Sequence, residues 1–433
     1  MTASVPTGLL ALGALAALVI ATVMFRAMPK AGILVWALVL FLVPVWVGAA
    51  VGPHWSAIGL LTIVLVIANW SRMTFHPADA LAAAFAGLVL ILHILGEVGL
   101  GAALIVFQDW MIPYLWGRLV LTRVPGSSIS NAISIGALIA AVLAILEFVT
   151  SFNPFVLIPG AEPLWSSWSG LQPRGGVLRA EGAFGHSIAL GATLAMSTAF
   201  VVHSRWRSLP KIVTVAVIVA ATVLTFSRAG QITIVLTLAA SIALIPGLSR
   251  RFRITVLSLA AVGVGIALPV IEAVLGAAGD EAAGSAGYRS DLLVLLGQVK
   301  AFGDAGEWQT LVAGDHYLGF FADSVDNALL LALLRYGLVP TLLMSLVIIT
   351  PVVLLLRRQW RSPAAIAVAC QLPSLVVVAL ITQYGVAFWF CIGLAVAWGV
   401  SGTLEDGQER PVPPARAHRA HHIVSSLRGA SYR

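Results

Sequence analysis

Apolar runs of about 18–22 residues, separated by short polar or Gly/Pro stretches, dominate this sequence, and a helix of that length crosses about 30 Å of hydrocarbon. The strands of a membrane barrel would instead alternate apolar and polar residues over segments of about ten positions. The run from Ser130 to Val149 is apolar nearly all round and shows no such alternation. The sequence therefore predicts helical spans, in which each segment satisfies its own backbone hydrogen bonds.

The scarcity of charge supports this interpretation. Only 10% of the residues are charged and 60% are hydrophobic, whereas soluble domains usually carry about 25% charged residues. We therefore expect an all-α fold, a polytopic transmembrane helical bundle of about 12–13 helices, with two extracytoplasmic loops that bear short helices. The expected spans are 7–25, 31–50, 57–71, 78–96, 102–121, 130–150, 186–203, 211–227, 229–246, 254–276, 327–350, 363–381 and 385–402.

Basic residues fall in every second connection between these spans, as at Arg26, Arg72 and Arg123. By the positive-inside rule those connections are cytoplasmic, and the long loops at 151–185 and 277–326 are extracytoplasmic. We expect one transmembrane domain over residues 1–402 of a multi-pass protein of the inner (cytoplasmic) membrane. The remaining segment, 403–433, is rich in Pro, Arg and His, which predicts a disordered cytoplasmic tail.

Several classes of function are disfavoured. The net charge of +7 reports the topology of a membrane protein, so no nucleic-acid partner is expected. The cytoplasmic connections are too short for a nucleotide-sugar or ATP-binding domain, and no Gly-rich phosphate loop is present. Cys370 and Cys391 lie in apolar runs and are expected to be small core residues. Without a strong cluster of metal ligands, neither a metal ion nor another cofactor is expected.

Candidate site residues lie on the extracytoplasmic side. The first long loop ends in residues 179–186, directly before an apolar run, and two glycines in this segment permit tight turns. Arg179, Glu181 and His186 are then expected at the membrane surface. Trp168, earlier in the loop, fits either an interfacial aromatic belt or a platform for stacking on sugar rings.

Two further charged residues lie close to the hydrocarbon. Arg228 interrupts a long apolar stretch, and the half before it has about fifteen residues, or about 22 Å of helix. This places Arg228 at or just below the outer membrane boundary, where it either snorkels to lipid headgroups or clamps a phosphate group. Asp109 lies in the outer half of the fifth span and is either a structural partner of an arginine or a site residue.

The second long loop supplies the remaining candidates. Arg289 opens a segment whose apolar residues follow helical spacing, which predicts an amphipathic helix on the outer leaflet. His316 follows, and then Asp323, Asp326 and Asn327 come directly before the next apolar run. The two aspartates share a face if this region is helical.

The order of these segments resembles the O-antigen ligase and polymerase superfamily, integral membrane glycosyltransferases of bacterial surface polysaccharides. The resemblance covers about residues 179–345 and consists of a Gly-rich Arg segment, a Ser-Arg-small-Gly break, an Arg-starting amphipathic helix and an Asp-Asn-x-x-Leu-x-x-x-Leu-x-x-Gly-Leu segment. Arg179, Arg228 and Arg289 match arginines of the family. Asn327 matches the Asn of its His-Asn segment, in which this chain has Asp326 in place of the histidine.

The resemblance implies transfer or polymerisation of oligosaccharide from a polyprenyl-diphosphate-linked donor onto a glycan or glycolipid acceptor. The reaction would occur at the extracytoplasmic face, among membrane lipids, and ligase and polymerase both remain open. A transporter or flippase of lipid-linked glycans, or a non-catalytic scaffold for envelope assembly, are the alternatives. The expected catalytic residues are Arg179, Arg228, Arg289, Asp326 and His316, and the expected substrate-binding residues are Glu181, His186, Asp323, Asn327 and Asp109.

Overall fold

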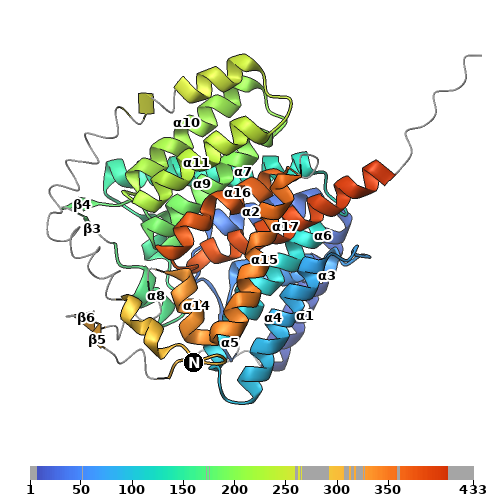
Figure 1. The fold of residues 1–433 in the computed structure, drawn as a ribbon, viewed down its shortest axis with the longest axis vertical. Coiled ribbons are helices and arrows are strands. Elements are labelled where there is room, and N and C mark those ends of the chain that lie inside the picture. The colour runs from blue at the N-terminus through green and yellow to red at the C-terminus, as the bar shows by residue number, and fades with distance from the viewer. Residues whose placement is uncertain are drawn as a thin grey trace, which may run out of the picture.

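The structure, a computed structural model, describes residues 7–50, 52–171, 173–174, 176–258, 262–263, 265, 292–306, 312–313, 316–317, 325, 327–357 and 361–407. This part of the chain is built almost wholly of helices (Figure 1). Its strands form short antiparallel hairpins of two strands each. The prediction of a helical fold is therefore confirmed for the described residues.

The first half of the chain forms mainly helices that follow the expected apolar runs. The helices are α1 (Thr7–Ala27), α2 (Pro29–Leu42), α3 (Ala57–Ala68), α4 (Pro77–Ile94), α5 (Leu100–Leu104), the π-helix η1 (Ile105–Met111), α6 (Ile112–Val120) and α7 (Gly126–Thr150). A hairpin of β1 (Gly48–Ala50) and β2 (His54–Ser56) connects α2 to α3. The elements α5, η1 and α6 follow one another without a gap.

The segment after α7 holds small elements: the 3-10 helices η2 (Pro154–Leu157) and η3 (Gly182–Phe184), α8 (Leu164–Trp168), and the hairpin of β3 (Pro173–Arg174) and β4 (Val177–Leu178). Next come α9 (Ser187–His203), α10 (Ser208–Leu224) and α11 (Arg228–Leu244). The later elements are η4 (Leu292–Gln298), β5 (Val312–Ala313), β6 (His316–Tyr317), α14 (Ala328–Tyr336), α15 (Leu338–Leu356), α16 (Pro363–Gln371), η8 (Leu372–Val376) and α17 (Thr382–Gly407).

Some of these helices are long and apolar enough to cross a membrane. In the described part of the chain, four helices meet this criterion: α4, α7, α15 and the Thr382–Ser401 part of α17. The pair Leu15–Ala27 and Pro29–Leu42, bent by 118°, adds a fifth candidate if it counts as one broken span. Shorter apolar helices occupy most of the other predicted spans. These findings support a membrane protein.

The boundaries differ from the predicted spans where local chemistry ends a helix. The expected span 31–50 ends at Leu42, because Pro44 disfavours helical backbone at Val43, whose φ is −114°. The expected span 327–350 is divided into α14 and α15 at Gly337, which has a φ of +87°. A side chain at that position would also lie 2.8 Å from the backbone of Phe302. The helix α17 continues to Gly407, beyond the expected boundary at 402.

The segment from Arg289 onward was expected to form an amphipathic α-helix. Its described part is instead the 3-10 helix η4, and Arg289 lies outside the described residues. Leu292 and Leu295 are buried in a small cluster with Leu330 and Leu334 of α14, while Val294 is 72% exposed. The two buried leucines are three residues apart and share one face of this 3-10 helix.

The central helix α17 packs closely against α6, and it also contacts α9, α15 and α16 (Figure 1). Glycines permit the close approach. A Cβ built on Gly117 of α6 would lie 2.2 Å from the Phe390 carbonyl oxygen, and one built on Gly393 of α17 would lie 2.0 Å from the Tyr114 carbonyl oxygen. Small residues at such a contact let two helix backbones approach, as is common between helices in membranes.

A buried ion pair joins α4 to α6. The Arg118 guanidinium donates to both carboxylate oxygens of Asp79, at 2.8 and 2.9 Å. The Tyr114 hydroxyl (2.6 Å) and the His76 backbone N–H (2.8 Å) also donate to this carboxylate. Burial, and after it the positive charge of Arg118, lower the pKa of His76. Its neutral ring accepts a hydrogen bond from Ala78 N at 3.1 Å and caps α4.

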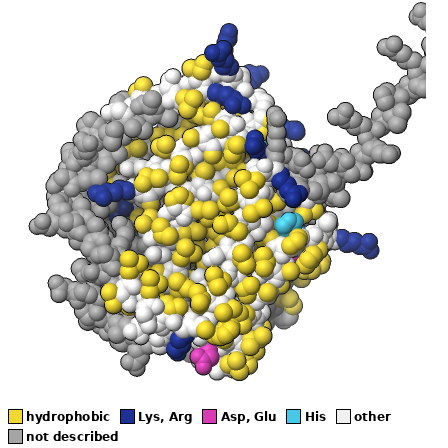
Figure 2. All heavy atoms as spheres, in the orientation of Figure 1, with side chains coloured by type: hydrophobic (Ala, Val, Ile, Leu, Met, Phe, Trp, Pro, Cys, Tyr) yellow, Lys and Arg dark blue, Asp and Glu magenta, His cyan; other side chains and the backbone are white. Residues whose placement is uncertain are grey.

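The outer surface of the helices is strongly apolar. Figure 2 shows a broad face of hydrophobic side chains, with most of the Lys and Arg side chains at its margin. Among the described residues, the most exposed apolar side chains include Ile94, Val149 and Leu356, which are 72–80% exposed. Soluble monomers rarely expose apolar patches larger than a few hundred Å², so this surface agrees with the composition in favouring a lipid environment.

Candidate functional site

A cavity of about 830 Å³ lies where several segments distant in the sequence meet. Its walls come from the β1–β2 hairpin, the α5–η1 helix, α8, α14 and residues 380–382. The polar and charged side chains that line it include His54, Gln108, Asp109, His186, Asp304, Arg335, Tyr336 and Thr382. This volume lies in the range of small-molecule sites.

Four residues of the cavity wall each have a buried polar atom without a hydrogen-bond partner among the described residues. These atoms are His54 Nδ1, Trp110 Nε1, His186 Nδ1 and Thr382 Oγ1. His54 Nε2 donates to the Val45 carbonyl at 2.9 Å, so in the neutral ring Nδ1 is an acceptor. Because native proteins leave few buried polar groups unsatisfied, these four atoms mark hydrogen-bonding capacity in the cavity wall that the described residues do not use.

Asp109 is the carboxylate that the π-helix contributes to the cavity. No hydrogen bond or ion pair joins its side chain to any residue that the structure describes, in contrast to Asp79. A π segment inside an α-helix often marks a functional site. A partly buried carboxylate without a cationic partner is costly, so the position favours a functional over a structural role.

Arg335 and Tyr336 enter the same cavity from the end of α14. The Tyr336 hydroxyl donates to the Ala102 carbonyl at 2.9 Å, which ties α14 to α5. Its ring packs edge-on against Trp110, with ring centroids 5.8 Å apart. The cavity thus has one cationic, one phenolic and one carboxylate side chain from two neighbouring helices.

The segment that contains Arg179 and Glu181 folds as a tight turn. Gly182 and Gly185 have φ of +55° and +60°, as expected for glycines that permit such turns. The buried Glu147 carboxylate, at the end of α7, accepts hydrogen bonds from Glu181 N (3.1 Å) and Gly182 N (2.8 Å). Glu147 therefore holds the turn in place, and Glu181 itself is fully buried.

This turn lies against the break that precedes Arg228. The Arg179 Nε donates to the Thr225 carbonyl at 2.9 Å, and Ala180 N donates to the Leu224 carbonyl at 3.2 Å. Ser227 caps α11 by accepting from Gly230 N at 3.1 Å, and Arg228 is the exposed first residue of that helix. The backbone segments that carry Arg179 and Arg228 are therefore neighbours, although neither arginine lines the cavity.

His186 connects the turn to the cavity. It lies directly before α9, lines the cavity and packs edge-on against Trp168, with ring centroids 5.8 Å apart. Burial, and second the positive charge of Arg179, lower the pKa of His186 to about 3. The ring is therefore neutral near pH 7.

The residues expected from the second long loop are only partly placed. Asn327 caps α14 by accepting a hydrogen bond from Leu330 N at 2.9 Å, and the next residue lines the cavity. His316 belongs to the backbone of β6, which pairs with β5. Arg289, Asp323 and Asp326 lie outside the described residues. The structure thus brings Asp109 and His186 to one cavity, places Asn327 at its edge, and keeps Arg179 and Arg228 outside it.

Several residues of the cavity wall were not predicted from the sequence. Arg335 stands in an apolar run, and that signal alone is enough to mark it as a candidate. His54, Trp110 and Thr382 give no such signal, because only the folded chain brings them together. Among the described residues, no group of three or more His, Cys, Asp or Glu side chains is placed to hold a metal ion.

Comparison with known proteins does not assign a function to this cavity. No family model, curated protein or solved structure matches the chain. The functional argument therefore depends on the sequence, the cavity and the segments around it.

Proposed function

We propose that this protein is an integral membrane glycosyltransferase of the inner membrane. It transfers or polymerises oligosaccharide from a polyprenyl-diphosphate-linked donor onto a glycan or glycolipid acceptor at the extracytoplasmic face. The chain crosses the membrane about 12–13 times, with shorter helices such as α10 and α11 completing the bundle. The observation that carries the proposal is the cavity lined by Asp109, Arg335 and Tyr336, in which no described residue forms a hydrogen bond or ion pair with the Asp109 carboxylate.

The segments that form the cavity support its extracytoplasmic placement. Its walls include residues of the connections near 45–56, 99–104, 163–168 and 380–382. Each of these connections belongs to the set with few basic residues, which the positive-inside rule assigns to the outer side. A donor that reaches this side is lipid-linked, because the chain offers no nucleotide-sugar domain.

The chemistry of the transfer matches the distribution of side chains. The acceptor hydroxyl oxygen forms a bond to the anomeric carbon of the donor sugar, and the bond from that carbon to the phosphate oxygen breaks. Asp109 accepts the hydroxyl proton as general base, and Trp168 offers a face for the sugar. The polyprenyl diphosphate leaves with the bonding electrons, and Arg335 of the cavity wall stabilises its developing charge. Arg179, Arg228 and Arg289 are proposed to bind the carrier outside the cavity.

The test is genetic and chemical. Cells that lack the protein are expected to accumulate the lipid-linked glycan donor, and the full-length chain restores its consumption. Asp109→Asn and Arg228→Lys are each expected to restore little consumption at normal protein levels, because asparagine is no base and lysine lacks the bidentate fork. Arg250→Gln, a change at an exposed arginine beyond the opposite end of α11 from Arg228, is the control. No change in lipid-linked glycans on removal of the protein would refute the proposal.

A transporter of lipid-linked glycans is a second candidate, favoured by the same unpaired carboxylate, since acidic residues inside spans commonly serve proton-coupled transport. Purified protein in liposomes separates the two functions. Donor and acceptor supplied on one side of the membrane give a new glycosidic product with a transferase. A transporter instead moves the donor across the bilayer and makes no product. A scaffold does neither.

A further inference from the structure

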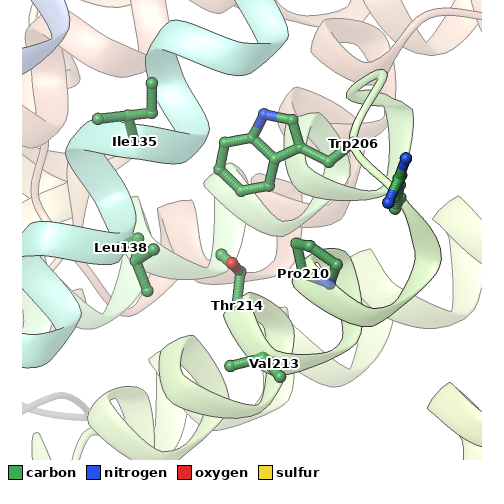
Figure 3. Close-up of a pocket in the computed structure, with 7 residues that line it drawn as sticks. Ile135, Leu138, Trp206, Pro210, Val213 and Thr214 are labelled. Carbon is green, nitrogen blue, oxygen red and sulfur yellow. The ribbon is translucent and has the colours of Figure 1, made fainter.

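A second hollow lies between α7 and α10, at the opposite end of these helices from the long loop 151–185. It is an open groove of about 530 Å³. Figure 3 shows Ile135 and Leu138 of α7 on one wall, Pro210 and Val213 of α10 on the other, and the Trp206 indole near one end. The groove is almost wholly apolar apart from this end, where Arg207 also lines it.

The groove has room for part of an acyl chain. Its lining residues on the α10 side run from Trp206 to Thr214, which corresponds to about 12 Å along a helix axis. On the α7 side the groove is lined by Ile135 and Leu138, near the middle of that helix, at a depth that hydrocarbon would surround. Tryptophan and arginine at the mouth are the residue types that favour the headgroup level of a bilayer.

The charge around the groove is of one sign. Between Gly182 and Ile271 the sequence contains no Asp or Glu, and its charged residues are all Arg or Lys. The part of α7 before Glu147 carries no charged residue. Arg205 and Arg207 are exposed beside the mouth, and the Lys211 ammonium donates to the Val202 carbonyl at 2.8 Å. An occupant with a negatively charged head and an apolar tail complements this arrangement.

We propose that this groove binds one anionic phospholipid of the cytoplasmic leaflet, with an acyl chain between α7 and α10 and the phosphate at Arg207. The assignment is independent of the glycosyltransferase proposal, because it concerns the other end of the helices. Anionic headgroups attract cationic residues at the cytoplasmic surface. The groove adds a specific site for one lipid to that general attraction.

Native mass spectrometry of the delipidated full-length protein tests this site, with dioleoyl phosphatidylglycerol and dioleoyl phosphatidylcholine as probes. The wild type is expected to retain phosphatidylglycerol about five-fold better than phosphatidylcholine, the factor that corresponds to one basic residue near a membrane surface. Arg207→Gln should bind both lipids equally. Arg250→Gln removes the same charge from an exposed residue outside the groove and should keep the preference.

A variant that fills the groove shows whether its occupant is a lipid or a polypeptide. Val213 is 51% exposed, so Val213→Trp is expected to fold, to fill the groove and to lose retention of both lipids. Equal retention of the two lipids by the wild type would overturn the proposal. So would an equal loss of preference in Arg250→Gln and Arg207→Gln, or the loss of a bound polypeptide, rather than a lipid, from Val213→Trp.

Discussion

Two carboxylates inside helices of this protein should respond in opposite ways to the same substitution. Asp79 accepts four hydrogen bonds, two from Arg118 and one each from Tyr114 and His76. Asp109 accepts none from the residues that the structure describes, and it lines the cavity. Asparagine has nearly the same shape as aspartate but no charge and only one acceptor oxygen, so it tests the role of each carboxylate.

The magnitudes follow from these contacts. In Asp79→Asn, whichever oxygen is replaced, two donors lose their acceptor and the Arg118 charge stays buried without a counter-charge. The expected loss of unfolding free energy is about 3–5 kcal/mol. Asp109→Asn removes an unpaired charge, so the unfolding free energy should stay the same or rise by up to about 2 kcal/mol. The same variant should lose transfer activity, as is usual when a functional site carries a destabilising group.

Unfolding of the purified protein in mixed micelles, followed by tryptophan fluorescence, measures both variants beside the wild type. Consumption of the lipid-linked donor measures their activity. A loss of stability in Asp109→Asn as large as that in Asp79→Asn would show that Asp109 is a structural anchor. Normal activity of Asp109→Asn would remove it from the reaction. Either result refutes the reasoning from the unpaired carboxylate.

Three further predictions concern packing, topology and pH. Gly117→Ala should lower the unfolding free energy by about 1–3 kcal/mol, because the added Cβ meets the α17 backbone. Gly87→Ala should raise the unfolding free energy by about 0.5–1 kcal/mol, because a Cβ there has nothing within 4 Å. Unfolding in mixed micelles measures both variants. A cysteine at Gly170 should react with an impermeant thiol reagent in intact cells and one at Gly407 should not, and the reverse pattern contradicts the orientation. Because the pKa of His186 falls from 6.5 to about 3 on folding, stability should decline as the pH falls below 6.5, and His186→Gln should make that decline shallower.

The helical segments followed from the apolar runs because the length and polarity of a run depend on local sequence alone. The expected span 186–203 differs from α9 by one residue at its start and ends at the same residue, and the expected span 229–246 differs from α11 by one residue at its start and two at its end. The division at Gly337 and the π segment η1 did not follow from the runs. Both depend on how neighbouring backbones pack, as the contact of Gly337 with Phe302 shows.

The candidate site was predictable only in part, for the same reason. Asp109 and His186 carry signals of their own, a charge inside an apolar run and a polar residue directly before one. Their meeting in one cavity with His54 and Tyr336 depends on segments up to about 280 residues apart in the chain. Sequence periodicity gives the direction of a side chain around its own helix, and it carries no information on which distant helix that side chain faces.

The π-helix η1 also sets the direction of Asp109 relative to the contact with α17. A regular α-helix turns about 100° per residue, so the residues of one continuous helix are fixed in phase with one another. The wider turn of η1, which contains Asp109, shifts that phase, so that Asp109 lines the cavity while Gly117 of α6 meets the α17 backbone. Deletion of one residue within 105–111 would remove this shift and turn Asp109 by about 100° relative to Gly117.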